Sequence, residues 1–222
     1  NIQLNSQGNF LPVRADLKFD GGVDKIEIAP VMEAQSLDEK FKLSGVLNTQ
    51  FDGKVTGATV NQLFDSLDMK ATFDGAKIRL SPLNIEQRVC QVVNLIAEQK
   101  LHQVNWDEFT EMRSLEVELV WKNRVINLTK ANAGVSQLNV SAVGSIDLAK
   151  AIYNIGLPIS ILSASETAVA SNCSLSTELA WLNRGLTLLR CVGDLNTLNL
   201  VKDCGPDKAA LAELTRDYAT FK

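Results

Sequence analysis

The sequence predicts an α+β fold: a predominantly antiparallel, twisted β-sheet with a few short helices and one longer amphipathic helix packed on it. Apolar and polar residues alternate through 114–163, which is the period of strands with one apolar face. Only residues 83–101 place a long apolar stripe at helical spacing. A sheet with many strands and one strong helix must be covered, fold on itself or leave a groove.

Strand patterns also fill the first part of the chain. Alternation predicts a strand over 1–20 that is interrupted near Pro12, and a long strand over 40–54. The dipeptide Asp74-Gly75 is typical of a hairpin, so we expect the chain to reverse there.

Consecutive antiparallel strands are expected within 114–163. Turns are predicted at Lys122-Asn123 and at 132–134. The last run of this segment contains Pro158, and a proline within a strand is tolerated chiefly at an edge or a bulge. We therefore place this run near a margin of the sheet.

Helices are predicted at four places. A short one is expected over 29–36, and a second follows Thr59, which is a good N-cap residue. The strongest pattern, within 83–101, is expected to lie on the apolar face of the sheet. Residues 208–218 close the chain as a helix that begins near Asp207.

Four cysteines allow three pairings, and their number alone does not choose among them. Cys191 and Cys204 enclose a short loop, and this spacing suits a disulfide that holds the last helix to the preceding strand. Cys90 and Cys173 are then left as a second bridge. The alternative is four unpaired thiols in the core, where free cysteine is often buried. There is no CxxC motif or Cys/His cluster, so neither a zinc site nor any other cofactor is expected.

Charge and hydropathy exclude some classes of partner. The formal net charge is −4, the pI is near 5.1, and basic residues do not cluster, so nucleic acid is not an expected partner. No apolar run reaches the roughly 18–20 residues of a membrane-spanning helix. The chain starts without methionine in polar, strand-like sequence, so we expect an excised fragment of a longer protein.

Catalytic activity is not expected. His102 is the only histidine, and no nucleophile or carboxylate motif surrounds it. A histidine at a helix C-terminus, favoured by the helix dipole, is the simpler interpretation. No glycine-rich phosphate loop is present either.

The apolar strand faces are the candidate functional surface. If they are not covered, they form a channel that holds acyl chains; if helices cover them, they form an ordinary core, and the sequence leaves both readings open. The candidate residues, either lipid-facing or core, are Leu115, Val117, Leu119, Leu138, Val140, Tyr153, Ile155 and Ile159.

Two segments resemble the C-terminal region of AsmA-type proteins. The first is LSGVLNTQFDGKVTGATVNQLFDSLDMKATFDGAKIRLSPLNIEQRVCQVVNLI, in which a strand is followed by a short helix, a DG dipeptide and a longer helix. The second is FTEMRSLEVELVWKNRVINLTKANAGVSQLNVSAVGSIDLAKAIYNIGLPISI, which contains a turn at 144–148. The first segment departs from the family pattern at Leu80-Ser81-Pro82, where a glycine-containing turn is more usual.

The resemblance implies one AsmA-like domain over 1–222, with strand-helix subdomains over 1–102 and 103–222. It implies a location in the periplasm, a tether to the inner membrane, and a role in outer-membrane assembly and cell envelope biogenesis. Kinship with bridge-like lipid transporters implies that phospholipid passes along the apolar sheet face. The alternative is a closed scaffold that binds outer-membrane assembly proteins through a sheet edge. An oxidising periplasm agrees with paired cysteines.

Overall fold

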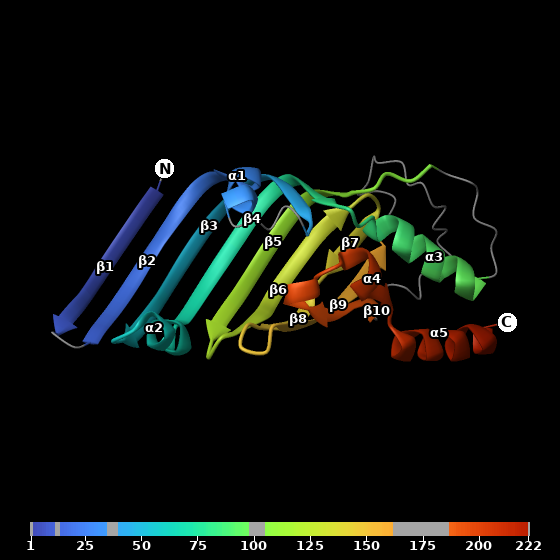
Figure 1. Cartoon of the computed structure of the whole chain (residues 1–222). Coiled ribbons are helices and arrows are strands. Elements are labelled where there is room, and N and C mark those ends of the chain that lie inside the picture. Colours follow the sequence, from blue (N-terminus) through green and yellow to red (C-terminus); the bar gives the residue numbers. More distant parts are fainter. Residues whose placement is uncertain (1, 12–13, 35–39, 98–104, 162–186, 222) are drawn as a thin grey trace.

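A computed structural model describes residues 2–11, 14–34, 40–97, 105–161 and 187–221. Eleven strands of these residues form one antiparallel sheet in the order β1-β2-β3-β4-β5-β6-β7-β9-β10-β11, with β8 paired to β6 and β9 (Figure 1). The strands are β1 (Ile2–Leu11), β2 (Arg14–Glu27), β3 (Lys42–Gly57), β4 (Asp68–Ser81), β5 (Thr110–Lys122), β6 (Val125–Val135), β7 (Leu138–Ser141), β8 (Val143–Asp147), β9 (Ile152–Ile161), β10 (Thr187–Asp194) and β11 (Cys204–Pro206). The predicted antiparallel β-sheet is confirmed.

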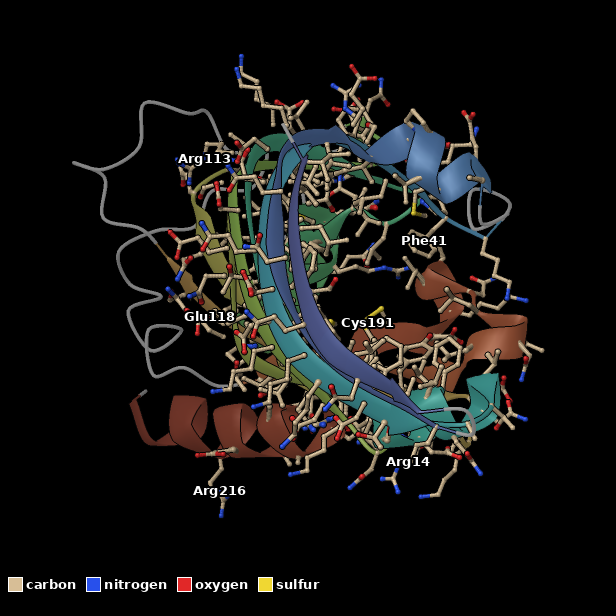
Figure 2. The ribbon with its side chains drawn as sticks, turned by 90° about the vertical axis from the view of Figure 1, so that its left-hand side faces the viewer. Arg14, Phe41, Arg113, Glu118, Cys191 and Arg216 are labelled. Atoms are coloured by element: carbon tan, nitrogen blue, oxygen red, sulfur yellow. A yellow bond between two sulfur atoms is a disulfide. The ribbon has the colours of Figure 1, made fainter. Side chains whose placement is uncertain are left out.

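The sheet is strongly curved, and its two faces differ in chemistry. Figure 2 looks along the row of strands and shows them bending around a concave side that holds Phe41 and Cys191, while Glu118 and Arg113 lie on the convex side. In β5, Val117 and Glu118 are neighbours, so they point to opposite faces. The concave face is therefore the apolar face that the alternation predicts.

Asp74 and Gly75 do not form the predicted hairpin. They lie inside β4, which pairs along its length with β3 on one side and β5 on the other. A Cβ atom on Gly75 would lie 2.7 Å from the carbonyl oxygen of Val46. This glycine thus permits a close approach of β3 beside a bulge, where Lys77 has a φ of 56°. The DG signal marks a bulged strand instead of a turn.

The turns of the central strands also differ from prediction. The β5–β6 turn is formed by Asn123 and Arg124, with φ values of 52° and 59°, one residue later than expected. Residues 132–134 are not a turn, because β6 continues through them to Val135. Their small side chains suit a crowded strand, and Ala133 is buried.

The strand that contains Pro158 is not at a margin of the sheet. β9 lies between β7 and β8 on one side and β10 on the other. Along β9, pairing passes from β8 at Gly156 to β7 at Ile159, and the β10 ladder has an irregularity between Thr187 and Leu189. Pro158 thus sits at a break in one ladder and beside a bulge in the other, where its missing N–H is tolerated.

Helices occupy the edges and one end of the sheet. They are α1 (Ile28–Ala34), α2 (Val60–Ser66), α3 (Ile85–Ala97), α4 (Leu200–Asp203) and α5 (Lys208–Phe221), together with the short 3₁₀ helix η2 (Leu195–Thr197). The expectation of a single longer helix is not confirmed, because α3 has 13 residues and α5 has 14. In α3, the side chains of Val89, Val92 and Val93 are at most 1% exposed. They pack in the core with Leu138 and Ile159 of the sheet.

Asp207 begins α5, as predicted. Its Oδ1 accepts hydrogen bonds from the backbone N–H groups of Ala209 and Ala210 at 2.9 and 3.1 Å, and its Oδ2 accepts one from the Arg190 guanidinium. The Arg190 hydrogen bond is the main cause that lowers the pKa of the Asp207 carboxyl, and burial opposes it. This carboxylate therefore stabilises the folded state in its charged form.

Stability is expected to depend on the charge of Asp207. Because its folded-state pKa is lowered, the stabilisation is present above the unfolded value of about 3.9 and is lost as the pH falls through the folded pKa. Asp207→Ala should cost about 1 kcal/mol in the free energy of unfolding at neutral pH, measured by urea titration. Asp207→Asn keeps a capping oxygen but does not titrate. This variant should therefore lose less free energy of unfolding than Asp207→Ala, and its stability should fall less steeply than that of wild type at acidic pH. If the free energy of unfolding of the variants depended on pH in the same way as that of wild type, this role of Asp207 would be contradicted.

Candidate functional site

An apolar trough runs along the concave face, across the strands. Residues that pair directly across neighbouring antiparallel strands share one face, so the register defines the rows that line the trough. One row comprises Val117, Phe73, Thr49, Val23 and Ile2. The next comprises Leu119, Ala71, Phe51, Gly21 and Leu4.

The trough is open over its N-terminal strands. Ile2 and Leu4 of β1 are 78% and 64% exposed, and Val117 and Leu119 of β5 are partly exposed. The large apolar core instead gathers around α3 at the other end. An apolar surface of this kind, left in contact with solvent, usually marks a binding site.

Two short helices form the rims of the trough. α1 precedes β3 and α2 follows it, and Figure 2 shows them at opposite edges of the curve. Phe64 of α2 stacks on Trp121 of β5, with ring centroids 6.3 Å apart, and Asp65 forms an ion pair with Arg124. Thr59 accepts a hydrogen bond from the backbone N–H of Gln62 at 3.3 Å and so caps α2, as predicted. The α2 rim is thus fixed to the β5–β6 end.

A segment between two cysteines forms a wall at the C-terminal end of the trough. Cys191 and Cys204 form a disulfide between β10 and β11, which agrees with the pairing that their spacing favours. We call the residues between these strands, Leu195–Asp203, the strap. Its leucines, Leu195, Leu198 and Leu200, are partly buried against the core.

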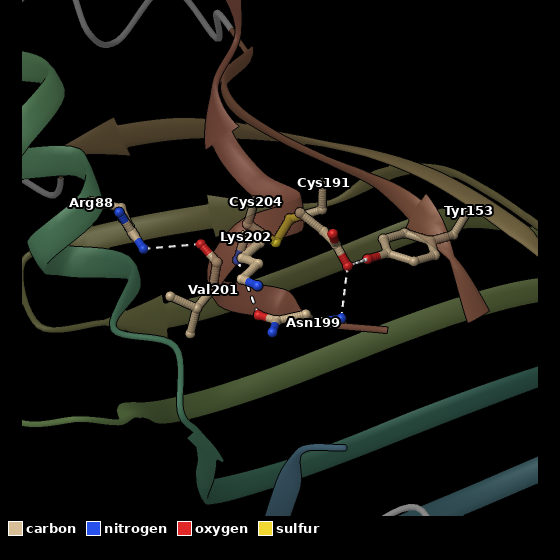
Figure 3. Close-up of a disulfide and its surroundings, with 8 residues drawn as sticks. Arg88, Tyr153, Cys191, Asn199, Val201, Lys202 and Cys204 are labelled. Atoms are coloured by element: carbon tan, nitrogen blue, oxygen red, sulfur yellow. Dashed lines mark hydrogen bonds between the residues drawn. A yellow bond between two sulfur atoms is a disulfide. The ribbon is translucent and has the colours of Figure 1, made fainter. Parts of the chain in front are cut away.

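The strap is held from two directions by cationic side chains. Lys40, which precedes β3, donates from Nζ to the carbonyl oxygen of Leu195 at 2.7 Å. Arg88 of α3 donates to the carbonyl oxygen of Val201 at 3.1 Å (Figure 3). Both bonds satisfy backbone oxygens and keep the charges themselves at the outer surface.

A buried tyrosine holds the strap from below. The Tyr153 hydroxyl donates to Oδ2 of Asp203 at 2.6 Å, and the same oxygen accepts from the backbone N–H of Asn199 at 2.8 Å (Figure 3). Tyr153 is 4% exposed. Burial, followed by the neighbouring carboxylate, raises the pKa of Tyr153. The hydroxyl therefore stays neutral and serves as a donor.

Between the sheet and the strap lies an apolar cavity of about 420 Å³. Strands β5 to β9 form its floor, and Phe41, Leu43 and Leu80 form one side. Ile85 of α3 and the strap leucines close the end. None of the described residues that line it carries a charge. This is the size of a small-molecule site, with a lining that suits hydrocarbon.

The structure places all eight candidate residues on the concave face, but in two environments. Leu138, Val140, Tyr153 and Ile159 are buried, with at most 4% exposure, whereas Leu115, Val117, Leu119 and Ile155 are partly exposed. The five that border the cavity are Leu115, Val117, Val140, Tyr153 and Ile155. The alternation therefore placed these residues on one face of the sheet, but it did not separate the buried part of that face from its open part.

Other parts of the site were not predicted. Phe41 and Leu43 carried a signal, because they alternate with polar residues at the start of a long strand. For the strap, the only feature of the sequence that pointed to it was its position between two cysteines. Cys90 is buried and is not a free thiol, whereas Cys173 and His102 lie outside the described residues.

Within the described ranges, no group of three or more His, Cys, Asp or Glu side chains is arranged to hold a metal ion. The helices described here include none with the length and apolar character to cross a membrane.

Comparisons with known proteins are negative: no family model, curated protein or solved structure matches this chain.

Proposed function

We propose that this chain is a non-catalytic domain that binds the acyl chains of phospholipids along the concave face of its sheet. The observation that carries the proposal is the open apolar trough, which is continuous with a cavity whose described lining residues carry no charge. Each methylene moved from water into such a trough contributes about 0.8 kcal/mol. The mechanism is passive: strand faces solvate the chains while headgroups remain in water.

The dimensions of the trough suit an acyl chain. Neighbouring strands are about 4.8 Å apart, so the span from β1 to β6 is about 24 Å. The hydrocarbon of one bilayer leaflet is about 15 Å thick, which is half of the usual core thickness. One chain therefore fits within the trough without leaving the sheet.

The resemblance to AsmA-type proteins supports a cellular context for this activity. We propose that the domain acts in the periplasm, tethered to the inner membrane in the full-length protein, and contributes to outer-membrane assembly. The disulfide between Cys191 and Cys204 agrees with an oxidising compartment.

A second candidate is a scaffold that binds an outer-membrane assembly protein through a sheet edge. The observation that favours it is β1, whose outer edge pairs with no strand of the described residues. A scaffold of this kind would keep its partner when a charge is placed in the trough. A lipid-binding domain would lose its ligand.

Native mass spectrometry of the protein purified from a periplasmic preparation tests the proposal. We expect mass increments that match whole phospholipids, with lipid extraction confirming their identity. A clean apo mass, under conditions that retain lipid on a known carrier, would contradict lipid binding and favour the scaffold.

A further inference from the structure

We propose that the trough is closed at its C-terminal end, so that an acyl chain binds with its terminal methyl beneath the strap and its headgroup toward the β1 side, over β4 and β5. This inference rests on the proposed function and adds to it the direction of the ligand. It also assigns a role in selecting chain length to the strap leucines, Leu195, Leu198 and Leu200.

The end beyond the cavity is filled by the protein itself. Val89, Val92 and Val93 of α3 are at most 1% exposed, and so are Leu188 and Leu189 of β10. These side chains belong to the same core cluster as the floor of the cavity. In Figure 1, α3, α4 and β10 gather at the end of the sheet opposite β1. A chain that enters from the β1 side therefore meets a packed wall.

The strap closes the C-terminal end of the cavity and is anchored at both of its own ends. The disulfide joins Cys191 and Cys204, which precede and follow it. Between these points, Lys40 binds the carbonyl oxygen of Leu195, and the Leu195 N–H donates to the Ala151 carbonyl oxygen at 2.8 Å. Because Lys40 comes from the chain before β3, it connects the strap to a distant part of the trough wall. The strap is thus a fixed wall of the cavity.

The chemistry of the cavity selects hydrocarbon as its occupant. Its lining includes Tyr153 and Asn132, but the Tyr153 hydroxyl already donates to Asp203 and the Asn132 side chain accepts a hydrogen bond from the Ser141 hydroxyl. A peptide in this space would leave backbone N–H and C=O groups without partners, and a charged headgroup would lose its hydration. The methyl end of an acyl chain has no such groups. The headgroup must therefore remain over the open strands, where water reaches it.

Photocrosslinking with two phospholipid isomers tests the direction. One isomer of palmitoyl phosphatidylethanolamine carries a diazirine near the terminal methyl, and the other carries it near the carbonyl. Each probe is bound to the full chain and irradiated, and the labelled peptides are then mapped by mass spectrometry. We expect the methyl-end probe to label the strap and β9, and the carbonyl-end probe to label β4 and β5, which lie about three to four strand spacings nearer to β1.

The labelling pattern separates a wrong direction from a wrong function. Reversed labelling, or equal labelling of both regions by both probes, would overturn the direction but leave the lipid function standing. Labelling of only the convex face, or no labelling, would contradict the lipid function and this inference together.

A pair of tryptophan variants tests the role of the strap in selecting chain length. Leu198→Trp should fill part of the cavity, and each excluded methylene should weaken binding by about fourfold, which shifts preference to shorter chains. Val201→Trp is the matched control, because Val201 lies in the same strap but is 40% exposed and does not line the cavity. An unchanged chain-length profile in a folded Leu198→Trp protein would contradict the assignment.

Discussion

Val117→Asp is expected to weaken phospholipid binding by more than about tenfold while leaving the protein folded. Val117 lies on the concave face of β5, between Phe73 of β4 and Ala131 of β6 in the register. Among the residues that the structure describes, none with a charge lines the cavity that Val117 borders, so an aspartate there would lie against the bound chain without a counter-ion. Lipid titration followed by native mass spectrometry measures the change.

Val120→Asp is the matched control for that variant. Val120 lies on the same strand but on the convex face, where it pairs with Lys70 and Asn127 and is partly exposed. The substitution is chemically identical, and it should leave lipid binding near the wild-type value. Equal losses in both variants would show that a general effect on the fold, and not occupation of the trough, explains the result.

Leu138→Ala is expected to lower the free energy of unfolding by about 2–5 kcal/mol. Leu138 is 0% exposed and packs in the cluster that contains α3. Leu119→Ala removes the same atoms from the same face of the sheet, but from a partly exposed position, so it should cost only about 1 kcal/mol. Urea unfolding of both variants measures the difference. Similar costs at the two sites would mean that the trough over β5 is as closed as the core.

Local patterns of the sequence predicted most elements of the fold. Alternation in 40–54 and in 114–122 predicted strands that the structure contains, Thr59 caps a helix as expected, and the last helix begins next to Asp207 as expected. These features depend on neighbouring residues, which a single sequence contains.

The errors share one physical cause. Asp74-Gly75 and residues 132–134 have turn-like composition, but their small side chains serve close packing between strands, and tertiary pairing overrides the turn signal. Pro158 suggested an edge, but a break and a bulge in the neighbouring ladders accommodate it. Which strand is internal depends on partners distant in sequence.

The sequence could predict which face of the sheet is apolar, but not which part of that face is open to solvent. Leu119 and Leu138 have the same apolar character in alternating strands, yet one is partly exposed and the other is fully buried. The difference arises from where α3 and the strap pack, and both positions depend on long-range contacts such as that of Lys40 with Leu195. No local pattern records these contacts.

Methyl NMR with a spin-labelled phospholipid tests most directly whether acyl chains occupy the concave face. The methyl groups of Val117 and Leu119 report on the trough, and those of Val120 and Val192 report on the convex face. We expect a phospholipid with a nitroxide on its acyl chain to broaden the concave methyl resonances and to leave the convex ones sharp. Equal broadening of both faces, or broadening of the convex face alone, would contradict the account.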